Sequence, residues 1–133
     1  MKVTVKYTYP EKGTRNGRIY SQEVLEKAFG ESAFKERCLA NVVPIKDEAG
    51  EFIGMGTAYL KDERAVTIDA EVFSPAHINV LKTAGRNFGL TLAGYGNVVH
   101  KNGVGIVTDF TIESALLCEH PAIDCSMELY PED

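Results

Sequence analysis

Apolar and polar residues alternate along several short stretches of the chain, and this period of two is typical of strands with one buried face. The first stretch is residues 2–9, whose apolar face is formed by Val3, Val5, Tyr7 and Tyr9. Further strands are expected at residues 38–45, 51–60, 65–73, 88–96, 97–107 and 108–118. Within residues 97–107, Asn102-Gly103 separates two Val-rich arms and predicts a β-hairpin.

Two other stretches have helical spacing. The first predicted helix runs from Ser21, as N-cap, to about Lys35. The second runs from Pro75 to Ala84, because Ser74-Pro75 is a strong helix start and Gly85 a good stop. Two helices among six or seven strands predict an α+β fold. We expect a mainly antiparallel β-sheet or barrel with two flanking helices, in one domain over residues 1–133.

Composition and charge exclude some functions. The 133 residues are 44% hydrophobic and 25% charged, as in globular proteins. The formal net charge of -5 argues against a nucleic-acid partner, because phosphate contacts need clustered Lys and Arg. No apolar run approaches the ~18 residues of a membrane span, and the N-terminus lacks the continuous apolar segment of a signal peptide. We therefore expect no membrane partner and a reducing compartment.

The three cysteines, Cys38, Cys118 and Cys125, form no C-x-x-C pair, which agrees with a reducing compartment. Cys38 and Cys118 have apolar neighbours and are expected to be small core residues. A metal site could be proposed from Cys125, His120 and Asp124, but these residues do not follow the usual zinc-ligand patterns. We expect no metal and no cofactor.

Candidate chemistry is sparse, since the chain has no G-x-S-x-G, Walker or H-E-x-x-H motif. The three histidines fall in separate elements, and His77 is expected to face solvent from the second helix. Asp69 and Glu71 lie on one strand face, and a solvent-facing strand face accounts for two carboxylates at these positions. The glycine-rich stretch "FGLTLAGYG" (88–96) has two interpretations: tight packing at a barrel corner, or a nucleophile strand that presents Thr91 beside backbone N–H groups.

Three blocks of sequence resemble a known family. "NGRIYSQEVLEKA" (16–28) resembles the N-terminal signature of tailed-phage prohead maturation proteases. "LKTAGRNFGLTLAGYGNV" (81–98) is similar to that family's helix, glycine turn and nucleophile strand, and "VTDFTIESALLCEHPAIDCSM" (107–127) to the strand that follows. The blocks keep the family's order and span roughly residues 14–127. The resemblance implies an assemblin-like fold, a β-barrel with surrounding helices, and cleavage of scaffold and capsid proteins by a Ser nucleophile with a His base.

The chain departs from this pattern at the active site. Thr91 stands where the family has its Ser, and apolar residues replace the polar ones beside it. Residues 38–60 contain no His, although the family's base is expected there. A Thr hydroxyl needs a base to be a nucleophile, and loss of a general base costs ~10²–10⁴-fold in rate. We expect no catalytic residue, with Thr91 at the nucleophile position and His77 and His100 as weak base candidates.

Three functions stay open. The first is a non-catalytic, capsid-associated pseudoenzyme that acts in shell assembly or as an accessory capsid component. Its expected partners are the major capsid or scaffold protein, or further copies of the chain, in the host cytoplasm during assembly and in the virion. The second is an active maturation protease with Thr91 as nucleophile and His77 or His100 as base. The third is an unrelated cellular α+β binding domain.

Two structural expectations follow from the resemblance. The N-G-R-x-Y segment is expected to have a structural role. Asn16-Gly17 would make a turn, while Ile19 and Tyr20 would pack into the core beside the first helix. Residues 88–96 form a central strand, with Thr91 near a shallow groove.

Overall fold

The computed structural model of the protein describes residues 1–30, 41–61 and 64–130. One sheet has seven strands: β1 (Lys2–Thr8), β3 (Asn41–Lys46), β4 (Phe52–Lys61), β5 (Ala65–Val72), β6 (Phe88–Tyr95), β9 (Thr111–Glu119) and β10 (Ser126–Tyr130). A second sheet has three: β2 (Arg18–Tyr20), β7 (Val98–Lys101) and β8 (Val104–Val107). The described helices are α1 (Gln22–Phe29) and α3 (Pro75–Ala84), the latter followed by the 3-10 turn η1 (Gly85–Asn87).

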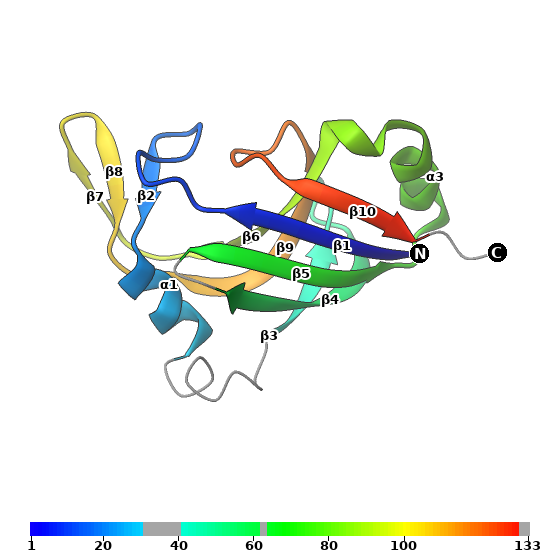
Figure 1. Cartoon of the computed structure of the whole chain (residues 1–133), viewed down its shortest axis with the longest axis horizontal. Helices are drawn as coiled ribbons and strands as arrows, with labels where there is room; N and C mark the ends of the chain where they lie inside the picture. The colour runs from blue at the N-terminus through cyan, green and yellow to red at the C-terminus, as the bar shows by residue number, and fades with distance from the viewer. Residues whose placement is uncertain (31–40, 62–63, 131–133) are drawn as a thin grey trace.

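The large sheet has the order β10-β1-β5-β4-β3-β9-β6 and curls into a half-barrel (Figure 1). The small sheet, ordered β2-β8-β7, lies at one end of the molecule and α3 lies at the other (Figure 1). The prediction of an α+β fold built mostly of sheet, with two helices, is confirmed. Within the described residues no helix is long and apolar enough to span a membrane.

The alternating stretches form the inner face of the half-barrel. β1 lies between β5 and β10 and pairs with both in antiparallel register, so that Lys2 lies opposite Glu71 on one side and Tyr130 on the other. Every second residue of β1 and β5 is buried, as the period of two predicts. These buried residues include Val3, Val5, Tyr7, Val66, Ile68, Ala70 and Val72.

Two of the described strand pairs are parallel, although the sequence predicts a mainly antiparallel sheet. β3 pairs with β9, with Ile45 opposite Ala115, and β2 pairs with β8, with Ile19 opposite Ile106. Parallel neighbours need a long connection, and here each pair is separated by several intervening elements. The other pairs are antiparallel.

The strand β6, expected at the centre of the sheet, lies at its edge and pairs only with β9 within the described residues. Two side chains contact its free edge: the Leu92 N–H donates to the Tyr7 hydroxyl (2.9 Å), and the Cys125 Sγ lies 3.9 Å from the Leu90 carbonyl oxygen and 3.3 Å from that of Ile123. Tyr7 comes from β1, near the opposite end of the strand order. We call this contact between β1 and β6 the seam of the half-barrel.

The glycines that suggested a central strand allow close approach at this edge. A Cβ on Gly94 would lie 1.8 Å from the carbonyl oxygen of Thr111, where the β6–β9 register shifts. A Cβ on Gly89 would lie 2.4 Å from the ring of Pro121. The stretch 88–96 therefore follows the tight-packing interpretation at a sheet edge.

The N-G-R-x-Y segment makes the expected turn at Asn16-Gly17 and packs Tyr20 against the core, whereas Ile19 is half-buried in β2 and is not part of the core contacts. Gly17 has a φ of +77°, and its carbonyl accepts from the Gly105 N–H at 2.8 Å, which ties the loop to β8. Tyr20 packs against Tyr9 (ring centroids 4.7 Å apart) and Phe110 (5.4 Å). The segment thus joins the small sheet to the core.

Helix α1 begins where the sequence predicts. The Ser21 hydroxyl accepts from the Val24 N–H at 3.2 Å, and Leu25 and Phe29 are buried against the sheet. The helix ends at Gly30, which has a φ of +86°. The expected extension to Lys35, and Cys38 as a core residue, lie outside the described residues.

The Asn102-Gly103 hairpin between β7 and β8 is also confirmed. Both turn residues have positive φ, 53° and 78°, as a two-residue type I′ turn requires.

Candidate functional site

Three side chains form a continuous hydrogen-bonded chain where α3 meets the β3–β4 turn. The Ser74 Oγ lies 2.6 Å from His77 Nδ1, and His77 Nε2 lies 3.0 Å from Asp47 Oδ2. Ser74 is the N-cap residue of α3, His77 is in its first turn, and Asp47 directly follows β3. We call Ser74, His77 and Asp47 the relay.

The β3–β4 turn holds the carboxylate of Asp47 in place. Asp47 Oδ1 accepts from the backbone N–H of Glu51 (2.8 Å) and of Ala49 (3.0 Å), which leaves Oδ2 for His77. The Glu51 N–H, with smaller contributions from His77 and Ala49, lowers the pKa of Asp47 below its ordinary value. Asp47 is therefore an ionised, fixed acceptor at neutral pH.

This acceptor sets the proton positions on His77. An ionised carboxylate can only accept, so Nε2 carries the proton and donates to Asp47. In a neutral imidazole the other nitrogen is then an acceptor, and Nδ1 faces the Ser74 hydroxyl. The side chains of His77 and Asp47 are 23% and 17% exposed, so the expectation that His77 faces solvent is wrong. His77 is partly covered because it contacts the β3–β4 turn, which is distant from it in sequence.

Two exposed aromatic residues flank the relay. Phe73 directly precedes Ser74, Phe52 directly follows Glu51, and their rings contact edge-to-face with centroids 5.4 Å apart. Phe52 is 51% exposed and Phe73 is 52% exposed, so this pair presents apolar surface to solvent.

The structure does not bring the expected catalytic residues together. Thr91 is half-buried in β6 opposite Leu116, and within the described residues its hydroxyl makes no hydrogen bond. Both ring nitrogens of His77 are bonded to other groups. His100 is exposed on β7 in the small sheet. No residue serves Thr91 as a base in the part of the chain that is described.

Two hollows on the described surface, of about 420 and 260 Å³, are lined by residues other than Thr91. The strand carrying Thr91 is an edge strand whose free side contacts Tyr7 and Cys125.

The cysteines and the residues of the possible metal site contact other groups. Cys118 and Cys125 are half-buried, so Cys118 is not the fully buried core residue expected. Burial raises the pKa of the Cys125 thiol to about 11. Asp124 pairs with Arg15 and His120 lies 3.8 Å from Glu119. Within residues 1–30, 41–61 and 64–130, no group of three ligand-type side chains is placed to hold a metal.

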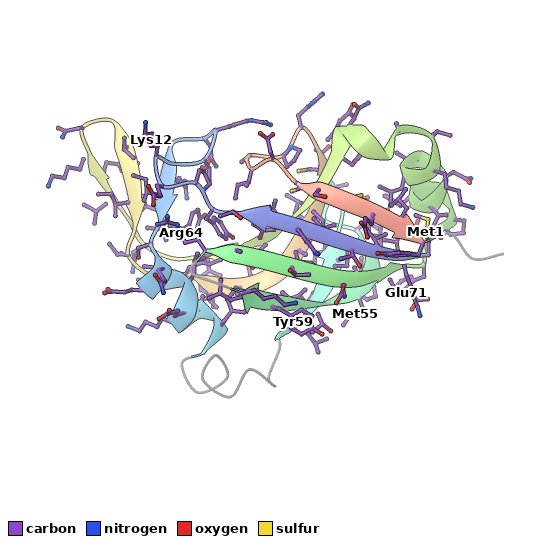
Figure 2. The ribbon with its side chains drawn as sticks, in the orientation of Figure 1. Met1, Lys12, Met55, Tyr59, Arg64 and Glu71 are labelled. Atoms are coloured by element: carbon purple, nitrogen blue, oxygen red, sulfur yellow. The ribbon has the colours of Figure 1, made fainter. Side chains whose placement is uncertain are left out.

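The outer face of the large sheet carries a shallow hollow of about 420 Å³. Met55, Tyr59 and Glu71 project outward from β4 and β5 (Figure 2). Asp69, expected with Glu71 on a solvated face, is exposed and accepts from the Thr4 hydroxyl at 2.9 Å. Among the described residues, this face mixes charged groups with apolar ones.

Sequence reasoning missed the relay, although part of its signal was present. "SPAH" places Ser74 and His77 three residues apart at a helix start, and that spacing puts both on one face. Asp47 had no such signal, because the turn that carries it is thirty residues from His77.

No protein-family model, curated protein or solved structure matches this chain. Its function is therefore inferred from the residues themselves.

Proposed function

We propose that the chain is a capsid-associated protein on a prohead-protease-like scaffold, which acts by binding other capsid chains and does not cleave them at Thr91. The proposal rests on one observation: within the described residues, the threonine at the family's nucleophile position has no imidazole beside it. Without a base the hydroxyl keeps its proton and cannot attack a peptide bond.

Two further features support a binding role. The three sequence blocks stand in the order of the prohead protease family, and the fold is mostly sheet, as that resemblance implies. The outer face exposes Val42 (68%) and Met55 (39%), and exposed apolar side chains among charged ones are what a docking surface needs. The expected partners are the major capsid or scaffold protein, met in the host cytoplasm during assembly and retained in the virion.

The first test is cleavage. The purified chain is incubated with its scaffold and major capsid protein, and the products are followed by electrophoresis and mass spectrometry. We expect no cleavage, and normal assembly with Thr91→Ala. Products that vanish with Thr91→Ala would refute the proposal and favour the active protease.

The second test is binding. Purified virions should contain the chain intact, since a structural component stays while a maturation protease is usually lost. In co-sedimentation with capsid shells, Met55→Asp should weaken binding, while Tyr95→Asp, at an exposed apolar site on β6, should not. If neither wild-type chain nor variant co-sediments, the capsid role is wrong and the unrelated binding domain is favoured.

The alternative, an active maturation protease, has one specific observation in its favour. The imidazole of His77 is oriented by a carboxylate and hydrogen-bonded to a hydroxyl, but that hydroxyl belongs to Ser74. Including Ser74→Ala in the cleavage assay distinguishes this case from cleavage by Thr91.

A further inference from the structure

We propose that Ser74, His77 and Asp47 form a nucleophilic site that takes an apolar or aromatic acyl group from an ester. The inference goes beyond the proposed capsid role and does not depend on it. It rests on the hydrogen-bonded order hydroxyl, imidazole, carboxylate, with distances of 2.6 and 3.0 Å. These three groups have the roles of nucleophile, base and orienting carboxylate in serine hydrolases.

The chain contains its own comparison for Ser74. Ser21 is the N-cap of α1 and does the ordinary work of that position, since its hydroxyl accepts from the Val24 N–H. Ser74 is the N-cap of α3, but its hydroxyl makes no capping hydrogen bond and is directed to Nδ1 of His77. Capping therefore does not explain the placement of the Ser74 hydroxyl.

The arrangement allows a balanced acyl transfer. The Ser74 oxygen attacks the ester carbonyl carbon while its proton passes to His77 Nδ1, which the Asp47 carboxylate keeps free to accept. The C–O bond to the alcohol then breaks, and the departing oxygen takes the proton from His77. Water, activated by the same nitrogen, hydrolyses the acyl-serine and restores the hydroxyl. In chymotrypsin Nε2 of the histidine is the base and Nδ1 bonds the carboxylate, whereas here Nδ1 faces the serine and Nε2 bonds Asp47. Either nitrogen of a neutral imidazole can act as the base.

The start of α3 supplies donors for the developing oxyanion. The first N–H that bonds within the helix is that of Ile78, which donates to the Ser74 carbonyl at 2.9 Å. The N–H groups of Ala76 and His77 precede it and belong to the free positive end of the helix dipole. They lie within the same turn as the Ser74 hydroxyl. They can therefore donate to the carbonyl oxygen of an ester attacked by Ser74, which is the atom that becomes negatively charged.

The aromatic pair gives the substrate class. Phe52 and Phe73 are each about half exposed, and their rings contact each other. Phe73 directly precedes Ser74, and Phe52 directly follows Glu51, whose N–H donates to Asp47. An apolar or aromatic acyl group laid on these rings would place its carbonyl near Ser74, whereas an acetyl group would bury little surface.

Covalent labelling tests the nucleophile. An alkyl fluorophosphonate forms a bond from serine oxygen to phosphorus and releases fluoride, so the adduct can be located by peptide mass spectrometry. We expect wild-type chain to be labelled at Ser74, and the labelling rate to fall at least about 100-fold with His77→Gln, which keeps hydrogen-bonding groups but is no base. Ser74→Ala should remove the adduct, while Ser21→Ala, the matched N-cap variant, should keep it.

A second measurement tests the acyl preference. Hydrolysis of p-nitrophenyl benzoate should exceed that of p-nitrophenyl acetate in kcat/KM, and Phe73→Ala should reduce the difference mainly through KM. Thermal melting of each variant separates loss of function from loss of fold. Absence of labelling on folded wild-type chain, an equal label on Ser21, or a Ser74 label unaffected by His77→Gln would overturn the inference.

Discussion

Replacing Tyr7 with Phe would test whether the seam of the half-barrel stabilises the fold. The hydroxyl of Tyr7 accepts from the Leu92 N–H at 2.9 Å and lies 3.4 Å from the Tyr9 hydroxyl. Tyr7 is 5% exposed and Leu92 8%, so water cannot replace the lost partner easily. Burial raises the pKa of Tyr7 well above its ordinary value, so the hydroxyl is neutral and this hydrogen bond persists over the usual pH range.

The cost of this substitution can be bounded from the structure. Phe keeps the ring, so little packing is lost, and the change is confined to the hydroxyl. A buried N–H left without a partner costs about 1–3 kcal/mol. Typical domains are stable by about 5–15 kcal/mol, so the loss should be easy to measure.

Urea unfolding followed by circular dichroism gives the free energy, and hydrogen exchange gives its location. We expect Tyr7→Phe to lower the free energy of unfolding by about 1–3 kcal/mol and to speed exchange of the Leu92 amide. Tyr95→Phe is the matched control, because Tyr95 is 61% exposed, and it should stay within about 0.5 kcal/mol of wild type. Equal stability of Tyr7→Phe and wild type, with unchanged exchange at Leu92, would refute the role of the seam.

Two further predictions concern the β6–β9 bulge and the relay. Gly94→Ala should destabilise by more than the ~1–3 kcal/mol of ordinary overpacking, measured by urea unfolding, because its Cβ would meet the backbone of Thr111 at 1.8 Å. Hydrogen bonds, chiefly from the Glu51 N–H, lower the pKa of folded Asp47, so its ionised form stabilises the fold above about pH 4, and this contribution is lost as the pH falls further. The stability difference between wild type and Asp47→Asn should therefore be largest near neutral pH and shrink below about pH 4, as seen in urea midpoints at several pH values.

Each of these predictions has a clear contrary result. Gly85→Ala is the control for Gly94, since its Cβ would meet only the flexible end of Leu129, at 3.3 Å, and should cost far less. Equal losses at the two glycines would show that the close approach in β6 is not what requires glycine. For Asp47, a difference between wild type and the Asn variant that is constant from pH 7 to about pH 3 would mean that ionisation of this carboxylate does not stabilise the fold.

Local signals in the sequence predicted several elements correctly. The Ser74-Pro75 start and the Gly85 stop bounded α3 at residues 75–84, and Asn102-Gly103 marked the hairpin turn. The signals at Pro75 and in the hairpin succeed because proline geometry and positive φ act within a few residues. The Ser74 side chain makes no capping hydrogen bond and Gly85 has a φ of -56°, so side-chain capping and a left-handed glycine do not set the bounds of α3.

Features that depend on distant residues were not predictable in this way. Glycines in residues 88–96 indicated close approach, but not whether the neighbour would be a central strand or, as found, Pro121 and a bulge at the edge. The relay was missed for the same reason: His77 meets Asp47 only because the sheet brings the β3–β4 turn to α3. A single sequence gives the residue types of such a site but not which of them contact one another in the fold.

The position of β1 has a consequence for the order of events during synthesis. β1 leaves the ribosome first among the strands, yet its partners are β5 and β10, so its pairing with Ser126–Tyr130 waits for about 120 more residues. At 5–20 residues per second this delay is roughly 6–25 s. Throughout that interval β1 has at least one unpaired edge, open to other chains. Such non-local pairing also slows folding, so a chain stalled before β10 would keep an open β1 edge and be a substrate for chaperones, proteolysis or aggregation.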